Sequence, residues 1–175
     1  MISSIPKWVI NLLGSTMQPN VMVAEIRYIS LQIKRIRFQG DISKWNFQIG
    51  YASVMRVSET EFRNYTVAHH DKGKGIFDII FHIHGNGIGS QYIDALKTGD
   101  ELYVSPPRGK KLYDQSLKQQ LFFGDETCLG IAVSLLPYLQ KNSHQFQFCF
   151  ELNEENKDVP GLLGLENFSV FLKNG

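Results

Sequence analysis

The sequence lacks the features that mark several large protein classes. Its 18 basic and 17 acidic residues give a net charge of +1, so no excess charge indicates a nucleic-acid or membrane surface. No apolar run approaches the roughly 20 residues needed to span a bilayer. The two cysteines, Cys128 and Cys149, form no CxxC pair and have apolar neighbours, which is typical of reduced thiols. We therefore expect a cytoplasmic protein that binds neither nucleic acid nor membrane.

The N-terminus also lacks the pattern of a signal peptide. Such a peptide has a charged start, an unbroken apolar centre and a small-residue cleavage site. Residues 1–17 instead carry apolar side chains at helical spacing, with polar residues between them. The apolar residues are Ile5, Trp8, Val9, Leu12 and Leu13. This spacing predicts a short amphipathic helix over residues 1–17, packed on the domain or on a partner subunit.

The chain has ample material for a core, because 43% of its 175 residues are hydrophobic and 12% are aromatic. Between residues 18 and 112, β-branched and aromatic residues recur in short runs separated by turn signals. The runs predict strands at 21–29, 31–38, 47–57, 62–69, 76–84 and 101–105, and a short helix at 90–96. Successive strands with one inserted helix favour an antiparallel β-barrel over residues 18–112.

The pattern changes in residues 113–175. Short strands are expected at 120–123, 146–152 and 168–172, with a helix at 127–140 and a charged loop at 154–158. A strand, a helix and a second strand form a βαβ unit, which implies parallel pairing. We therefore expect a truncated α/β lobe after the barrel.

Residues 63–66 carry the first candidate site. On a strand, Arg63 and Tyr65 point to the same face, about 7 Å apart. A guanidinium can bind a pyrophosphate while a phenol ring stacks on an isoalloxazine, and the Thr66 hydroxyl would lie near the flavin edge. The same tetrapeptide also suits an ordinary barrel strand with a surface arginine, and taken alone it favours that interpretation.

A glycine turn supplies the second candidate site. Gly87, Gly89 and Ser90 follow a strand and open a helix, where backbone N–H groups and the positive end of the helix dipole can hold a diphosphate. Ser90 is expected to cap the helix. The glycines do not fit GxGxxG, so this is not a Rossmann fingerprint. A plain glycine turn with a capping serine is an equally good interpretation of this segment alone.

Two histidines on one strand raise the question of a metal. His82 and His84 share a strand face, as a metal pair would. A third ligand would have to come from His69, His70 or an acid, and none has helpful spacing. We therefore predict no metal site, and place His84 against a flavin or a phosphate.

Taken in order, these segments resemble the siderophore-interacting proteins, a branch of the ferredoxin-reductase-like flavoproteins. The family's RxYT motif is similar to residues 63–66, and its His-Gly followed by Gly-Pro-Ala-Ser resembles residues 84–90. Pro-Gly-Asp and the later Gly-Pro-Arg-Gly look like residues 98–100 and 106–109. Gly-Asp-Glu-Thr-Ala-Leu-Pro is similar to residues 124–130, which include Thr127. Four motifs in order make the resemblance fairly specific.

The resemblance implies an FAD-binding barrel, a partial NAD(P)-binding lobe and the reduction of a ferric siderophore. Hard oxygen donors hold Fe(III) far better than Fe(II), so reduction by a flavin releases the iron. The chain departs from the family at Ile88, Tyr92 and Gly130, where the family has proline, tryptophan and proline. Its C-terminal lobe is also shorter than theirs.

We therefore expect an FAD-dependent oxidoreductase that passes electrons from NAD(P)H to a small-molecule acceptor of the ferric-siderophore type. The alternatives are an FAD-binding or interaction module without nicotinamide-dependent turnover, and a bare barrel scaffold. The sequence assigns no catalytic residue and does not choose between NADH and NADPH. It also leaves open a homo-oligomer, in which the sheet edge exposed by the short lobe would pair with another chain.

Overall fold

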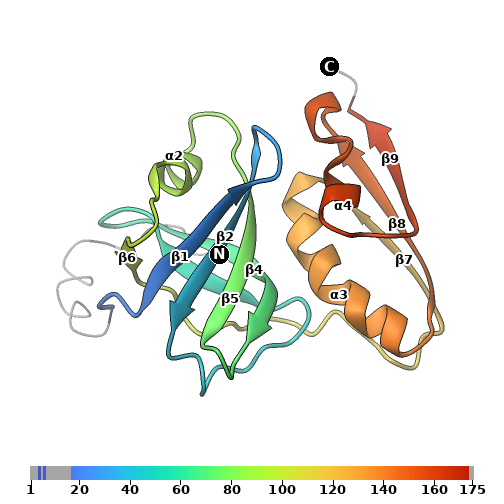
Figure 1. Cartoon of the computed structure of the whole chain (residues 1–175), viewed down its shortest axis with the longest axis horizontal. Helices are drawn as coiled ribbons and strands as arrows, with labels where there is room; N and C mark the ends of the chain where they lie inside the picture. The colour runs from blue at the N-terminus through green and yellow to red at the C-terminus, as the bar shows by residue number, and fades with distance from the viewer. Residues whose placement is uncertain (1–3, 5, 7–16, 174–175) are drawn as a thin grey trace.

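The computed structural model describes residues 4, 6 and 17–173, which form two sheets with a helix between them (Figure 1). The amphipathic helix predicted over residues 1–17 falls almost entirely outside the described residues. In the described part of the chain, no helix combines the length and the apolarity needed to cross a membrane.

The first part of the chain contains six strands and one helix, and the second part contains three strands and the remaining helices. The first group is β1 Val21–Tyr28, β2 Ile33–Gly40, β3 Ala52–Arg56, β4 Phe62–Asp71, β5 Ile76–His82, α2 Ile88–Ala95 and β6 Glu101–Leu102. The second group is β7 Gln119–Gly124, η1 Glu126–Cys128, α3 Leu129–Lys141, β8 Gln145–Leu152, η2 Glu154–Asn156, α4 Val159–Leu162 and β9 Phe168–Leu172.

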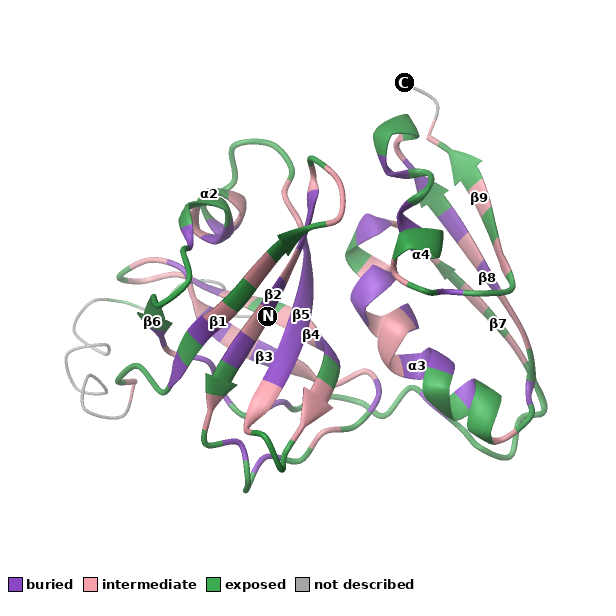
Figure 2. Ribbon diagram, in the orientation of Figure 1, coloured by how far each residue is buried: buried purple, intermediate pink, exposed green. Residues whose placement is uncertain are grey.

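The first sheet is an antiparallel, nearly closed barrel. Its strand order is β3-β4-β5-β2-β1-β6. Two isolated bridges, Met55 to Val104 and Ala52 to Arg108, join β3 to the segment that follows β6. Side chains at every second position of a strand share a face, and Phe77, Ile79 and Phe81 of β5 all belong to the barrel core. Figure 2 shows that β5 is buried along most of its length.

The second sheet is parallel, with the order β7-β8-β9. Helix α3 lies between this sheet and the barrel (Figure 1), and one apolar cluster contains barrel residues such as Ala68 and Ile80 together with Leu129, Leu135 and Phe148. Gly130 of α3 lies against the barrel: a Cβ built there would be in ordinary contact with the Thr66 carbonyl oxygen at 3.6 Å and with Ile80 at 3.8 Å. The two sheets are therefore held by a shared core.

The predicted fold class, an antiparallel barrel followed by a small α/β part, is confirmed. The predicted boundary between residues 112 and 113 falls in the linker between β6 and β7 and stays a prediction. The strand predicted at 47–57 is shorter than expected, because Gly50 has a φ of 89° and turns the chain before β3 begins. The charged loop predicted at 154–158 contains η2 instead, and Asn156 within it is fully buried.

Candidate functional site

A cavity of about 380 Å³ lies where β4, the end of β5, the start of α2 and the start of α3 meet. All eight residues predicted to bind a cofactor line it: Arg63, Tyr65, Thr66, His84, Gly87, Gly89, Ser90 and Thr127. These residues come from three segments that are well separated in sequence. The structure therefore brings the whole predicted set to one place, and the volume falls within the range of about 300–1,000 Å³ that is typical of ligand sites.

Strand β4 supplies one wall of this cavity. The Tyr65 ring packs edge-on against Phe81, with centroids 4.7 Å apart and planes at 70°. Burial raises the pKa of Tyr65 to about 12 despite the opposing effect of the Arg63 charge, so the phenol is neutral. The Arg63 guanidinium donates to the Phe62 carbonyl at 2.9 Å and lies 3.4 Å from the Glu61 carboxylate. It is about one-third exposed, so it remains accessible from the cavity.

The start of α2 forms a cradle against this wall. A Cβ built on Gly89 would lie 3.0 Å from the Tyr65 hydroxyl and 3.2 Å from Arg63 Cγ, closer than side chains normally approach. Glycine thus lets the helix backbone reach the two β4 side chains. Next to it, Gly87 has open space where a Cβ would be. Backbone N–H groups at a helix start are unpaired within the helix and attract anions.

The predicted role of Ser90 as a helix cap is wrong. Helix α2 begins two residues earlier, at Ile88, and its N-cap is Gly87, with no side-chain capping bond. The Ser90 hydroxyl instead accepts a hydrogen bond from the backbone N–H of His84 at 3.2 Å. Ser90 therefore ties the turn after β5 to the first turn of α2, and both border the cavity.

Thr127 lines the opposite side of the cavity, and Asp125 holds it in place. Asp125 Oδ1 accepts hydrogen bonds from the Thr127 backbone N–H at 2.9 Å and from its hydroxyl at 2.6 Å. Thr127 also lines a more open cavity of about 650 Å³ at the carboxyl ends of β7 and β8. Ligands of open α/β sheets bind at the carboxyl ends of the strands. Thr127 thus borders two adjoining spaces.

Beside Thr127, Glu126 is buried at the centre of a polar network. Its carboxylate accepts hydrogen bonds from the Asn153 backbone N–H at 2.7 Å and from the Lys173 ammonium at 2.5 Å. Burial acts to raise the pKa of Glu126, but these hydrogen bonds outweigh it and lower the pKa to about 2. The carboxylate is therefore ionised, and it joins η1 to the end of β9 and to η2.

Asn156 extends this network to the barrel. Its side-chain oxygen accepts a hydrogen bond from the Ser30 hydroxyl at 2.7 Å, and its amide donates to Gln32 at 3.0 Å and to Glu126 at 3.4 Å. Ser30 and Gln32 belong to the turn between β1 and β2. The network therefore joins η1, which contains Thr127, to the β1–β2 turn of the barrel.

The sequence interpretation missed several residues that line the cavity. They are Asn64, Ile80, Phe81, His82, Ile88 and Gly130. His82 was considered only as half of a metal pair; its ring centroid lies 4.9 Å from that of His84, and its buried Nε2 makes no hydrogen bond to the described residues. Burial lowers the pKa of His82, so its imidazole is neutral at pH 7. Among the described residues, no group of three metal-ligating side chains could hold an ion.

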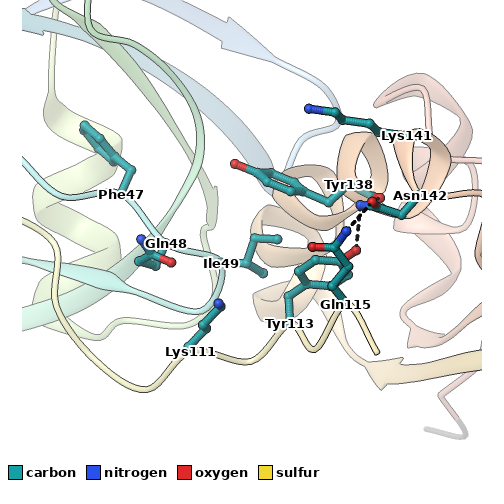
Figure 3. Close-up of a pocket in the computed structure, with 9 residues that line it drawn as sticks. All are labelled: Phe47, Gln48, Ile49, Lys111, Tyr113, Gln115, Tyr138, Lys141 and Asn142. Atoms are coloured by element: carbon teal, nitrogen blue, oxygen red, sulfur yellow. Dashed lines mark hydrogen bonds between the residues drawn. The ribbon is translucent and has the colours of Figure 1, made fainter. Parts of the chain in front are cut away.

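Another cavity, of about 360 Å³, lies near the opposite end of α3 (Figure 3). The loop with Phe47 and Gln48 faces Tyr138 and Lys141 of α3 across it, and Lys111 lies at its border. None of the eight predicted residues lines it. The predicted site is therefore the cavity at the start of α2 and α3.

The family follows from the barrel sequence itself. Residues 20–113 match the oxidoreductase FAD-binding domain family, which covers more than half of the chain. The chain belongs to this family. No curated protein matches its sequence.

Several solved structures share the fold of this chain. Phthalate dioxygenase reductase matches with a TM-score of 0.75 and 17% identity over 93% of this chain and 53% of its own. The siderophore-interacting protein SipS from Aeromonas hydrophila gives 0.71 and 19% identity over 91% of this chain and 68% of its own.

Full-length CYP116B46 from Tepidiphilus thermophilus gives a TM-score of 0.72 and 13% identity over 90% of this chain. This chain spans only 23% of the length of that protein. At such identities the likeness establishes the fold, and the resemblance to siderophore-interacting proteins and ferredoxin-reductase-like flavoproteins is confirmed at that level.

Proposed function

We propose that this FAD-binding-domain protein is a flavin-dependent oxidoreductase that passes electrons from NAD(P)H through FAD to a small-molecule acceptor of the ferric-siderophore type. The observation that carries the proposal is the convergence of all eight predicted residues on one cavity between the barrel and α3. Family membership supports FAD as the cofactor. The siderophore class of acceptor rests on the motif resemblance and on fold relatives such as SipS.

The residues present suit a dinucleotide. Gly89 lets the start of α2 pack closely on Tyr65 and Arg63, so the helix start and the guanidinium line the same cavity. The first N–H groups of a helix have no partner within it. Arg63 and the start of α2 would hold the pyrophosphate, while Tyr65 would offer its ring to the isoalloxazine. Thr66 would lie at the flavin edge.

The bound cofactor would supply the chemistry that links a two-electron hydride donor to two one-electron Fe(III) acceptors. This chain's residues would then bind and orient the reactants. Thr127, held by Asp125, lines both the proposed flavin cavity and the open space at the ends of β7 and β8, where a nicotinamide would bind if it follows the usual rule for open α/β sheets. The shared core around α3 excludes water from one side of this junction.

The absorption spectrum of the purified protein tests the proposal. We expect flavin bands after reconstitution with FAD, bleaching on anaerobic addition of a nicotinamide donor, and reoxidation by a ferric hydroxamate with Fe(II) captured by a chelator. Flavin bands that no nicotinamide donor bleaches would favour the module without turnover. A protein that takes up no flavin would overturn the proposal.

Exchanging Gly89 for alanine should separate helix stability from cofactor binding. Alanine favours the helical backbone over glycine by about 0.5–1 kcal/mol, but its methyl would crowd Tyr65 and Arg63 in the flavin-free protein as well, so we expect these opposing effects to leave the melting temperature nearly unchanged. The added methyl would press on the Tyr65 hydroxyl and Arg63 Cγ, so the Kd for FAD should rise. Calorimetric titration and thermal melting measure both. Gly161→Ala in α4, where a Cβ meets only ordinary contact at 3.7 Å, is the control and should bind FAD normally.

The residues that line the open cavity at the ends of β7 and β8 predict how well NADH and NADPH reduce the flavin. No lysine or arginine among the described residues lines it, whereas Asp125 and Glu151 do. A 2′-phosphate would therefore find carboxylates and no cation, so we expect NADPH to reduce the flavin no better than NADH, and both weakly. Stopped-flow reduction with each donor measures this. Rapid reduction that saturates at micromolar NADPH, with NADH far weaker, would contradict the prediction.

A further inference from the structure

The side chain of Lys34 is buried at the end of the barrel next to α2. It is 1% exposed and is among the largest of the fully buried side chains in the described part of the protein. Its ammonium donates to the carbonyl oxygens of Ile93 and Asp94, each at 2.9 Å, and lies 3.9 Å from the Asp94 carboxylate. These carbonyls belong to the last turn of α2, where helix carbonyls have no partner within the helix.

A second barrel residue completes this contact. The Tyr28 ring of β1 lies 5.1 Å from the Lys34 ammonium, and the Tyr28 hydroxyl donates to Asp94 at 3.2 Å. Strands β1 and β2 thus hold the C-terminal end of α2 through one cation and one phenol. A positive charge is favoured at this end of a helix, because the helix dipole is negative there.

Apolar contacts also hold α2: Ile93 belongs to the barrel core, together with Leu96 just after the helix, and Tyr92 packs against it. Of its eight residues, only Gly89 and Ile93 are buried. A helix of this length extends about 12 Å, so the end held by Lys34 and the end that lines the cavity move together. A shift of α2 would move the Gly87–Ser90 backbone away from Arg63 and Tyr65, which Gly89 approaches closely.

Taking an ammonium out of water costs free energy. An apolar side chain of similar volume often stabilises a protein as much as a buried charge or more, so the burial of Lys34 calls for an explanation. The barrel core near Lys34 is apolar, with Ile36 and Ile93 close in the same cluster. A methionine could fill this space, but it could not bind the α2 carbonyls.

We propose that Lys34 is a positioning residue for dinucleotide recognition: by binding the C-terminal carbonyls of α2, it holds the start of that helix where the second phosphate of FAD is recognised. This inference rests on the proposed FAD function. It assigns to Lys34 a part of the preference for FAD over FMN, since FMN has no pyrophosphate for the helix start to hold.

The test compares Lys34→Met with wild type by calorimetric titration with FAD and with FMN and by thermal melting without flavin. We expect the Kd for FAD to rise about tenfold, the size of a lost dipole and hydrogen-bond contribution, while the Kd for FMN changes less than about twofold. Hydrogen exchange of the α2 amides should accelerate. The melting temperature should fall, because methionine leaves the buried Ile93 carbonyl without its hydrogen bond.

Two further variants keep the test decisive. Tyr28→Phe removes only the bond to Asp94, and should shift the FAD to FMN ratio in the same direction by about twofold even if Lys34→Met does not fold. Leu165→Ala, which removes a buried contact in the other lobe, should lower stability without changing the ratio. Equal weakening of FAD and FMN in Lys34→Met, or an unchanged FAD affinity, would overturn the role of Lys34. Wild type that binds no FAD would overturn the proposed function instead.

Discussion

Replacing Arg63 by alanine should weaken FAD binding by about 1–3 kcal/mol, which is roughly a 5- to 150-fold rise in Kd. The guanidinium lines the cavity next to the α2 start, is one-third exposed, and is the one arginine among the described residues that borders this space. A hydrogen bond between a guanidinium and a phosphate is charge-assisted, and alanine leaves nothing in its place. Calorimetric titration with FAD measures the loss.

Two variants show whether the effect belongs to the site. Arg63→Lys keeps the charge but loses the planar fork, so its Kd should lie between those of wild type and alanine. Arg56→Ala removes an arginine from the neighbouring strand β3, where it bonds the carbonyls of Ser58 and Glu59 away from the cavity, and should leave FAD affinity unchanged. Equal FAD affinity for Arg63→Ala and wild type would remove Arg63 from the site.

The parts of this site that the sequence predicts are those set by local spacing. Alternation along one strand places Arg63 and Tyr65 on a common face, and a glycine turn after a strand places Gly87 and Gly89 at a helix start. These segments and Thr127 follow one another in the order of a known family's motifs. That order predicts that they share one site. The cavity contains all of them.

The parts that the sequence does not predict depend on long-range contacts. Asn156 reads as part of a charged loop, yet it is buried and bonds Ser30, 126 residues away. Lys34 lies in a basic stretch of a predicted strand, and nothing in that stretch indicates that its ammonium binds the end of a helix 59 residues later. Serine is a usual helix-cap residue, but the Ser90 hydroxyl accepts a hydrogen bond from the backbone N–H of His84 instead. Each depends on which segments meet in space.

Because of the Glu126 network, the free energy of unfolding should decrease in acid. The contribution of Glu126 to that decrease can be measured with one substitution. The pKa of Glu126 is about 2, below its ordinary value of 4.5, so the folded state favours the ionised form. A group with a depressed pKa contributes stability above its unfolded value that is lost as the pH falls towards its folded value. A difference of this size corresponds to about 3 kcal/mol, present above about pH 4.5 and lost between there and pH 2.

Glu126→Gln should therefore be about 3 kcal/mol less stable than wild type at pH 7, because the amide cannot pair with Lys173 or accept the Asn153 bond as strongly. Urea unfolding of both proteins from pH 7 to pH 2.5 gives the difference at each pH, which should shrink as the wild-type carboxylate takes up its proton. Other carboxylates titrate in both proteins and cancel. Glu154→Gln, which removes an exposed partner of Lys157, should differ from wild type by less than about 1 kcal/mol at every pH. A gap between Glu126→Gln and wild type that stays constant from pH 7 to pH 2.5 would show that ionisation of Glu126 does not hold this network together.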